Sequence, residues 1–197
     1  DFDIDRETVY YSNTYDEIFK AKGNAVEDTI KIGSPDKIEV DGDRLFITTR
    51  KAEEGYFYLI SADKITGDVF SRTALNDSHV TGGVFSTASI TGSSKGLWLI
   101  NTFKSRLELY GNELQLIEFF DLDRSYNYGN FRIGADNARI ICSKDGSIFI
   151  SSVDLKSGDQ RFSDRKCDSG TLDISVSAVT DNGIFIYDYR NGIIRIF

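Results

Sequence analysis

Five copies of one short pattern recur along the chain, and this repeat constrains its fold more than any other feature. Each copy is an apolar residue, an aromatic residue and a second bulky residue, followed by a variable position. The copies are Val9-Tyr10-Tyr11-Ser12, Leu45-Phe46-Ile47-Thr48, Leu97-Trp98-Leu99-Ile100, Ile148-Phe149-Ile150-Ser151 and Ile184-Phe185-Ile186-Tyr187. Their first residues are 36, 52, 51 and 36 positions apart. A strand unit repeated roughly every 40–50 residues is typical of the blades of a β-propeller.

The segments around each copy indicate an all-β chain. Helical periodicity is nearly absent, whereas period-two alternation and short apolar runs are frequent. We therefore predict a single domain over residues 1–197, a β-propeller of about five four-stranded blade units. The predicted units are residues 1–34, 35–80, 81–123, 124–172 and 173–197. The alternative is a β-sandwich, which also contains many short strands.

The two ends of the chain suggest that another segment completes the last unit. The chain starts on a segment that reads as a first strand and ends on one that reads as a third strand, with no fourth strand after it. Propellers remove open edges by pairing strands from the two termini. We expect either residues upstream of Asp1 or a protein partner to supply the outer strand, and the absence of Met at position 1 agrees with a longer chain.

Two parts of the chain resemble known propeller repeats. Residues 8–13, 17–21 and 35–41 resemble the YWTD repeat of lipoprotein-receptor propellers, although Tyr11-Ser12-Asn13 stands where that motif has Trp-Thr-Asp. Residues 179–188, with Asn191 and residues 195–197, resemble an NHL repeat. Both families are six-bladed rings that mostly bind proteins or, for some NHL members, RNA. The resemblance implies the fold and transfers no site residue.

Charge and cysteine content narrow the range of partners and compartments. The net charge is −8 and the basic residues are scattered, so we expect no nucleic-acid partner, since such binding needs clustered Lys and Arg. No apolar run approaches the roughly 20 residues that span a bilayer. Cys142 and Cys167 form either a disulfide of a secreted protein or two buried thiols of a reducing compartment. With the disulfide, we expect an extracellular or exported protein.

No catalytic signature is present in the sequence. His79 is the only histidine and lies in a polar, glycine-rich connection over residues 75–86. A zinc site needs three or four His or Cys ligands, and neither a Gly-x-Ser-x-Gly elbow nor a phosphate-binding loop is found. We predict no catalytic residue and no cofactor. The alternative is a hydrolase of the propeller lactonase kind, whose channel-bound Ca²⁺ takes ligands from several blades and leaves no local motif.

The segment of residues 121–132 is the most promising ligand surface. We expect it to be a long loop between blades, on the face where propellers tend to bind. Tyr126, Tyr128, Arg124 and Arg132 alternate there with small polar residues, a composition enriched at interaction hot spots. A second candidate is His79. Alternatively, the aromatic side chains fold back and cover the blade edge.

These observations predict a non-catalytic, propeller-type binding module for protein or glycan partners. A Ca²⁺-dependent hydrolase is one alternative. A structural subunit of a larger assembly, which exchanges strands with its neighbours, is the other.

Overall fold

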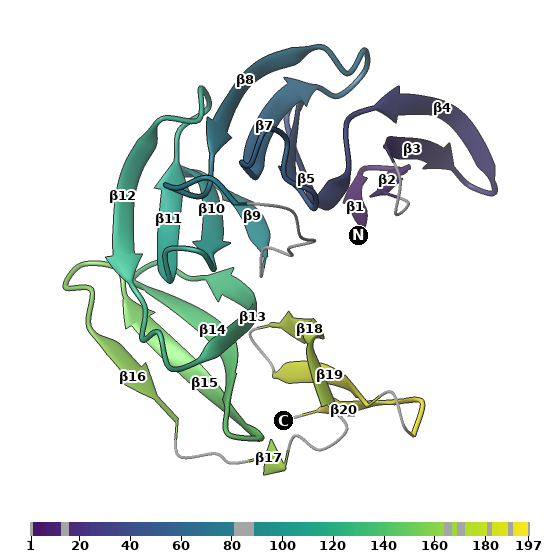
Figure 1. Ribbon diagram of the computed structural model, residues 1–197. Coiled ribbons are helices and arrows are strands. Elements are labelled where there is room, and N and C mark those ends of the chain that lie inside the picture. Colours follow the sequence, from purple (N-terminus) through teal and green to yellow (C-terminus); the bar gives the residue numbers. More distant parts are fainter. Residues whose placement is uncertain are drawn as a thin grey trace. The chain divides into compact units, whose positions relative to one another are not determined.

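The computed structural model describes residues 2–12, 16–80, 89–163, 167–168, 172–180, 183–188 and 191–196 (Figure 1). These residues form strands and turns, and five antiparallel sheets follow one another along the chain. Apart from the short strand β17, which pairs with β15, the neighbouring strands of each sheet are also consecutive in sequence, as in a propeller blade and unlike a β-sandwich. The predicted all-β propeller is thereby confirmed. No helix in the described ranges is long and apolar enough to cross a membrane.

We refer to the sheets as blades 1 to 5. Blade 1 consists of β1 (Phe2–Asp5), β2 (Thr8–Ser12), β3 (Glu17–Lys22) and β4 (Ala25–Lys31). Blade 2 consists of β5 (Pro35–Asp41), β6 (Arg44–Thr49), β7 (Tyr58–Asp63) and β8 (Val69–Ala74). Blade 3 consists of β9 (Ile90–Ser93), β10 (Gly96–Asn101), β11 (Arg106–Tyr110) and β12 (Leu116–Asp121).

The last two blades depart from four strands. Blade 4 consists of β13 (Asn127–Ile133), β14 (Asn137–Lys144), β15 (Ser147–Asp154) and β16 (Gln160–Phe162), and the short β17 (Cys167–Asp168) also pairs with β15. Blade 5 has three strands among the described residues, β18 (Leu172–Val179), β19 (Ile184–Asp188) and β20 (Ile193–Ile196).

The start of blade 4 corrects one expectation. Residues 127–133 do not form a loop, because they are strand β13, and the repeat copy of this blade consequently lies on its third strand instead of its second. A register shift between Tyr128 and Phe131 interrupts the period-two pattern and hides the strand in the sequence. Within the shift, a Cβ on Gly129 would lie 2.5 Å from the Ile174 carbonyl oxygen, so only glycine fits this close approach.

The chain divides into two compact units, the first of residues 1–104 and 108–118 and the second of residues 105–107 and 119–197. The first unit has two hydrophobic clusters. One is shared by blades 1 and 2 and contains Leu45 and Ile47, and the other is shared by blades 2 and 3 and contains Phe46. Successive residues of β6 thus face two different neighbouring blades. This double burial explains why the repeat is apolar at three consecutive positions.

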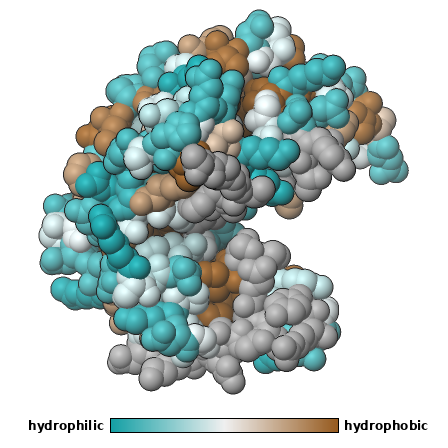
Figure 2. Space-filling view, viewed as in Figure 1, coloured by the Kyte–Doolittle hydropathy of each residue, from teal (hydrophilic) through white to brown (hydrophobic). Residues whose placement is uncertain are grey.

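The second unit is built on the same principle. Ile141 and Ile148 of blade 4 form a cluster with Ile184 and Ile186 of blade 5. The outer strands of the blades are exposed by comparison, and Figure 2 shows apolar residues over β8 and β12 separated by polar ones.

Candidate functional site

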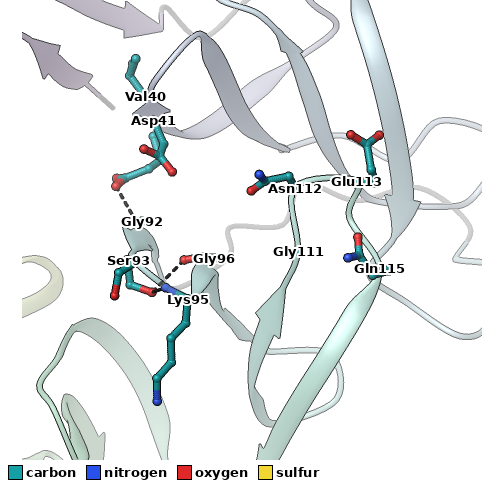
Figure 3. A pocket seen from close by; sticks show the side chains of 12 residues that line it. Val40, Asp41, Gly92, Ser93, Lys95, Gly96, Gly111, Asn112, Glu113 and Gln115 are labelled. Carbon is teal, nitrogen blue, oxygen red and sulfur yellow. Dashed lines mark hydrogen bonds between the residues drawn. The ribbon is translucent and has the colours of Figure 1, made fainter.

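A polar pocket of about 770 Å³ opens in the first unit, where hairpin ends of blades 2 and 3 meet (Figure 3). Its walls come from the end of β5, the β9–β10 hairpin and the β11–β12 turn. The lining residues are Glu39, Val40, Asp41, Gly92, Ser93, Ser94, Lys95, Gly96, Gly111, Asn112, Glu113 and Gln115.

The β9–β10 hairpin is fixed by its own short side chains and a required glycine. The Ser93 hydroxyl donates to the Gly96 carbonyl at 2.9 Å and accepts from the Lys95 amide at 3.2 Å. Gly96 has a φ of 132°, and a Cβ there would lie 2.3 Å from the Tyr110 carbonyl oxygen. No side chain can be tolerated at this position without moving the neighbouring strand. The hairpin therefore presents a defined backbone to the pocket.

Glu39 is the most perturbed titratable group of the pocket. Its carboxylate accepts a hydrogen bond from the Gly92 amide at 2.5 Å, which joins blade 2 to blade 3 (Figure 3). Burial raises the pKa of Glu39 to about 7, and the negative charges of Asp3 and Asp41 act in the same direction, while the Gly92 hydrogen bond partly offsets them. Asp3 is itself held in place, because it accepts from the Val40 amide at 2.6 Å.

The opposite wall is tied to blade 2 by an arginine. Arg44 pairs with Glu113 at 2.7 Å and donates to the Asn112 carbonyl at 2.7 Å and to the Ser61 hydroxyl at 3.2 Å. These contacts hold the β11–β12 turn against the neighbouring blade. The pocket thus has two walls that are each linked across blades 2 and 3 by a charged side chain.

The chemistry of the pocket is that of a hydrogen-bond acceptor. Glu39, Asp41 and Glu113 supply carboxylates, and Asn112 and Gln115 supply amide oxygens. Lys95 is the one basic residue among the described residues of the lining, and in Figure 3 its side chain extends away from these carboxylates. Among the described residues, no group of three or more His, Cys, Asp or Glu has an arrangement that holds a metal ion.

Of the residues predicted to bind a ligand, Tyr126 packs on its own blade. Its ring stacks on Phe162 with centroids 4.2 Å apart and meets Phe149 edge-on at 5.5 Å. The Lys144 ammonium lies 5.0 Å from the centre of the ring. The alternative in which the aromatic residues fold back on the blade therefore describes Tyr126.

Tyr128 is buried in β13. Its hydroxyl donates to the Asp123 carbonyl at 2.8 Å and accepts from Gln160 at 3.2 Å, and burial raises the pKa of the phenol. This placement does not favour a role as an exposed anchor. Arg124 and Arg132 are exposed, and like both tyrosines they belong to the second unit, outside the pocket.

His79 is exposed and packs on a neighbouring turn. Its ring meets Tyr56 edge-on at 6.3 Å, and a Cβ on Gly55 would lie 2.2 Å from it. These contacts give His79 a structural role in covering the turn. Residues 81–86 of the connection that contains it lie outside the described residues.

Cys142 is a buried free thiol whose pKa is raised to about 12 by that burial. Its predicted disulfide partner, Cys167, has a side chain outside the described part of the structure. The backbone of Cys142 pairs with Phe149 and that of Cys167 with Ile148, so β14 and β17 flank β15 on opposite sides. Two strand spacings are about 9–10 Å, beyond the roughly 7 Å that a disulfide spans, which disfavours the bridge.

Sequence reasoning did not find the pocket. Asp41-Gly42-Asp43 and Ser94-Lys95-Gly96 have the composition of ordinary hairpin turns, and Glu39 lies within an ordinary strand. The signal available was that charged and amide side chains cluster at the hairpin ends of two successive blades, which a propeller places side by side.

Comparison with known proteins supports the fold and names no family. No protein-family model matches the chain, and no curated protein matches it in sequence. Solved structures do match. A chain of a nidogen–laminin complex is 14% identical with a TM-score of 0.56, over 79% of this chain and 59% of that one. A protein of unknown function from Bacteroides caccae is 12% identical with a TM-score of 0.60, over 92% of this chain and 67% of that one.

Hydrazine synthase from Kuenenia stuttgartiensis is likewise similar, at 12% identity and a TM-score of 0.59, over 97% of this chain and 62% of that one. The chain thus spans less than two thirds of the nidogen–laminin and hydrazine synthase chains. At these identities the shared property is the fold. The similarity agrees with the resemblance to YWTD propellers at the level of architecture.

Proposed function

We propose that this protein is a non-catalytic binding module that holds a protein partner by accepting one of its Lys or Arg side chains in the pocket of blades 2 and 3. The observation that carries the proposal is the set of carboxylates around this 770 Å³ pocket, Glu39, Asp41 and Glu113. A guest ammonium or guanidinium group would donate charge-assisted hydrogen bonds to them, which are stronger than neutral ones.

The electrostatics of the pocket support a cationic guest. The whole chain carries a net charge of −8, which favours encounter with positively charged surfaces. Glu39 is half-buried, where charge interactions are screened less than in open water. A cation beside Glu39 would favour its ionised form, so binding releases a proton when the pH is below the pKa of about 7.

The absence of an aromatic platform favours a peptide over a glycan or another small organic ligand. Among the described residues that line the pocket, none is aromatic, and Val40 is the only large apolar one. Pockets for small organic ligands are lined mainly by apolar and aromatic side chains. To bind a flexible Lys or Arg side chain of a protein, a pocket needs only hydrogen-bond acceptors for the polar end of that side chain. The nidogen–laminin structure is that of a protein complex, which agrees with a protein partner.

The proposal is tested by affinity for a cationic peptide. Peptides enriched from a random library are expected to share a Lys or Arg, and their affinity, measured by calorimetry, is expected to fall at least about tenfold in the double variant Glu39→Gln/Asp41→Asn. The matched control is Glu27→Gln/Glu118→Gln, which removes the same charge from exposed outer strands.

Enriched peptides without a basic residue would contradict the proposal. An equal loss of affinity in the control double variant would do the same, because it would assign binding to the overall charge and not to the pocket.

A further inference from the structure

The outer strand of blade 2 contains a β-bulge at an aromatic residue. Ser71 of β8 pairs with Ser61 of β7. Val69 pairs with Ala62, the next residue of β7, so Phe70 is the extra residue between two paired positions. A bulge changes the direction in which a side chain points and is frequent beside functional sites. Phe70 is 50% exposed, so its ring is accessible from solvent.

The ring of Phe70 lies beside the wall of the pocket of blades 2 and 3. The guanidinium carbon of Arg44 is 5.0 Å from the centre of this ring. The same guanidinium group pairs with Glu113 at 2.7 Å and donates to the Asn112 carbonyl at 2.7 Å. Phe70 and Glu113 therefore flank one guanidinium group, and the acidic pocket continues into an aromatic surface.

Arg44 fixes this arrangement. Strand pairing places Asp41, which lines the pocket, directly opposite Arg44. The Arg44 guanidinium also donates to the Ser61 hydroxyl at 3.2 Å, and the side chain is only 28% exposed. A cation over the face of a ring is attracted to it, so Arg44 also holds the ring of Phe70. A ring that is already held loses little conformational freedom when a partner packs on it.

The distances fit an extended segment of a protein partner. Residues two positions apart in an extended chain point to the same side and lie about 7 Å apart. A segment whose Lys or Arg enters the pocket therefore brings a second side chain to the rim, where Phe70 is exposed. An apolar side chain gains from leaving water on the Phe70 ring, whereas a polar one finds no hydrogen-bond group on that ring.

We propose that Phe70 determines the sequence preference of the pocket, and that the partner's segment has a large apolar residue two positions from its Lys or Arg. This inference rests on the proposed function, because the pocket must hold the basic residue first. The second contact turns a general affinity for cations into recognition of a short sequence, since specificity is a difference between affinities.

The test compares two peptides by calorimetry, Leu-Gly-Arg-Gly-Leu and Gly-Gly-Arg-Gly-Gly. The wild type is expected to bind the first at least about fivefold more tightly. Phe70→Ala is expected to bind both equally. The matched control is Phe119→Ala, which removes a 44% exposed aromatic residue that also lies under an arginine, with Arg106 at 4.1 Å. Phe119 is not one of the described residues that line the pocket, so this control is expected to keep the preference.

The ratio of the two affinities isolates the contact of Phe70. If Phe70→Ala displaces Arg44, both peptides bind more weakly and their ratio stays that of the wild type. The inference is overturned if the wild type binds both peptides equally, if Phe70→Ala keeps the preference, or if Phe119→Ala loses it.

The double variant Glu39→Gln/Asp41→Asn separates this inference from the proposed function. A loss of affinity for both peptides in the double variant, without a preference in the wild type, leaves the proposed function standing and overturns only the role of Phe70. If the double variant binds both peptides as the wild type does, the proposed function and the role of Phe70 are both overturned.

Discussion

Two regions of the molecule contain side chains of the kinds that form binding surfaces, and the kinds differ. The first region is the pocket of blades 2 and 3, and the second is the segment of residues 124–132 in blade 4. The segment in blade 4 has tyrosines and arginines, and its tyrosines turn inward: Tyr128 is buried and Tyr126 stacks on Phe162. The pocket has carboxylates and amides at hairpin ends, and these remain accessible. Strands such as β6 are buried on both faces, so their aromatic residues pack in the core, whereas outer strands such as β12 leave aromatic residues such as Phe119 exposed. The accessible chemistry lies in the turns.

The largest loss of stability is expected for substitution of the buried tyrosine in the blade 4 segment. Tyr128→Ala is expected to lower the free energy of unfolding by about 3 kcal/mol, because it leaves a cavity and removes the hydroxyl that bonds Asp123 and Gln160. Tyr126→Ala, at a half-buried site, is expected to cost about 1 kcal/mol. Urea unfolding measures both. A Tyr128→Ala protein that is fully stable but loses partner affinity would reverse the comparison.

A smaller effect is expected at the hairpin that shapes the pocket. Gly96→Ala forces a Cβ against the Tyr110 carbonyl oxygen and is expected to cost about 2 kcal/mol. Gly42→Ala is the matched control, since Gly42 has a φ of 59° and nothing within 4 Å of a Cβ. We expect this control to cost about 1 kcal/mol or less and to leave peptide affinity unchanged. Equal melting temperatures for the two variants would contradict the account of the hairpin.

The pH dependence of the free energy of unfolding tests the environment of Glu39 in the pocket. The folded state binds the proton of Glu39 more tightly than the unfolded chain does, so the free energy of unfolding falls as the pH rises from 4.5 to about 7. Glu39→Gln removes this dependence and is expected to gain stability over the wild type across that window, on the order of 1 kcal/mol. Thermal melts at several pH values measure the difference. A difference that does not change with pH would show that Glu39 is not the perturbed group.

The smallest effect is expected at Arg44. Arg44→Lys keeps the charge and loses the forked contacts with Glu113 and the Asn112 carbonyl, so the expected loss of stability is about 0.5 kcal/mol. Because these contacts position one wall of the pocket, affinity for a cationic peptide is expected to fall severalfold while stability hardly changes. If Arg44→Lys changes the stability but not the peptide affinity, the β11–β12 turn is not part of the binding site.

Much of the fold could be predicted because its causes are local. The repeat copies are apolar at successive positions since both faces of their strands are buried, as β6 illustrates. A second repeated element is a turn that runs from an aspartate to a glycine. The turns that begin at Asp63, Asp154 and Asp188 each end at a glycine four residues later, whose amide donates to the aspartate carbonyl at 2.9 Å. Such turns can be recognised from composition alone.

The features that could not be predicted from the sequence depend on contacts between residues that are distant in the chain. The strand β13 was missed because Gly129 lies within a register shift, and the reason for that glycine is its contact with Ile174 in the next blade. The pocket was missed because Glu39 and Gly92, which it brings together, are 53 residues apart. No local pattern marks either residue. Their proximity follows from the contact between the inner strands β5 and β9.

The most direct test of the central claim is an NMR titration of the ¹⁵N-labelled protein with an arginine-containing peptide. We expect the amide signals of the pocket residues Gly92, Lys95, Gly96 and Gly111 to shift, with Gly92 affected most because its amide donates a hydrogen bond to Glu39. Shifts confined to residues 124–132 of blade 4, with the pocket amides unchanged, would contradict this expectation.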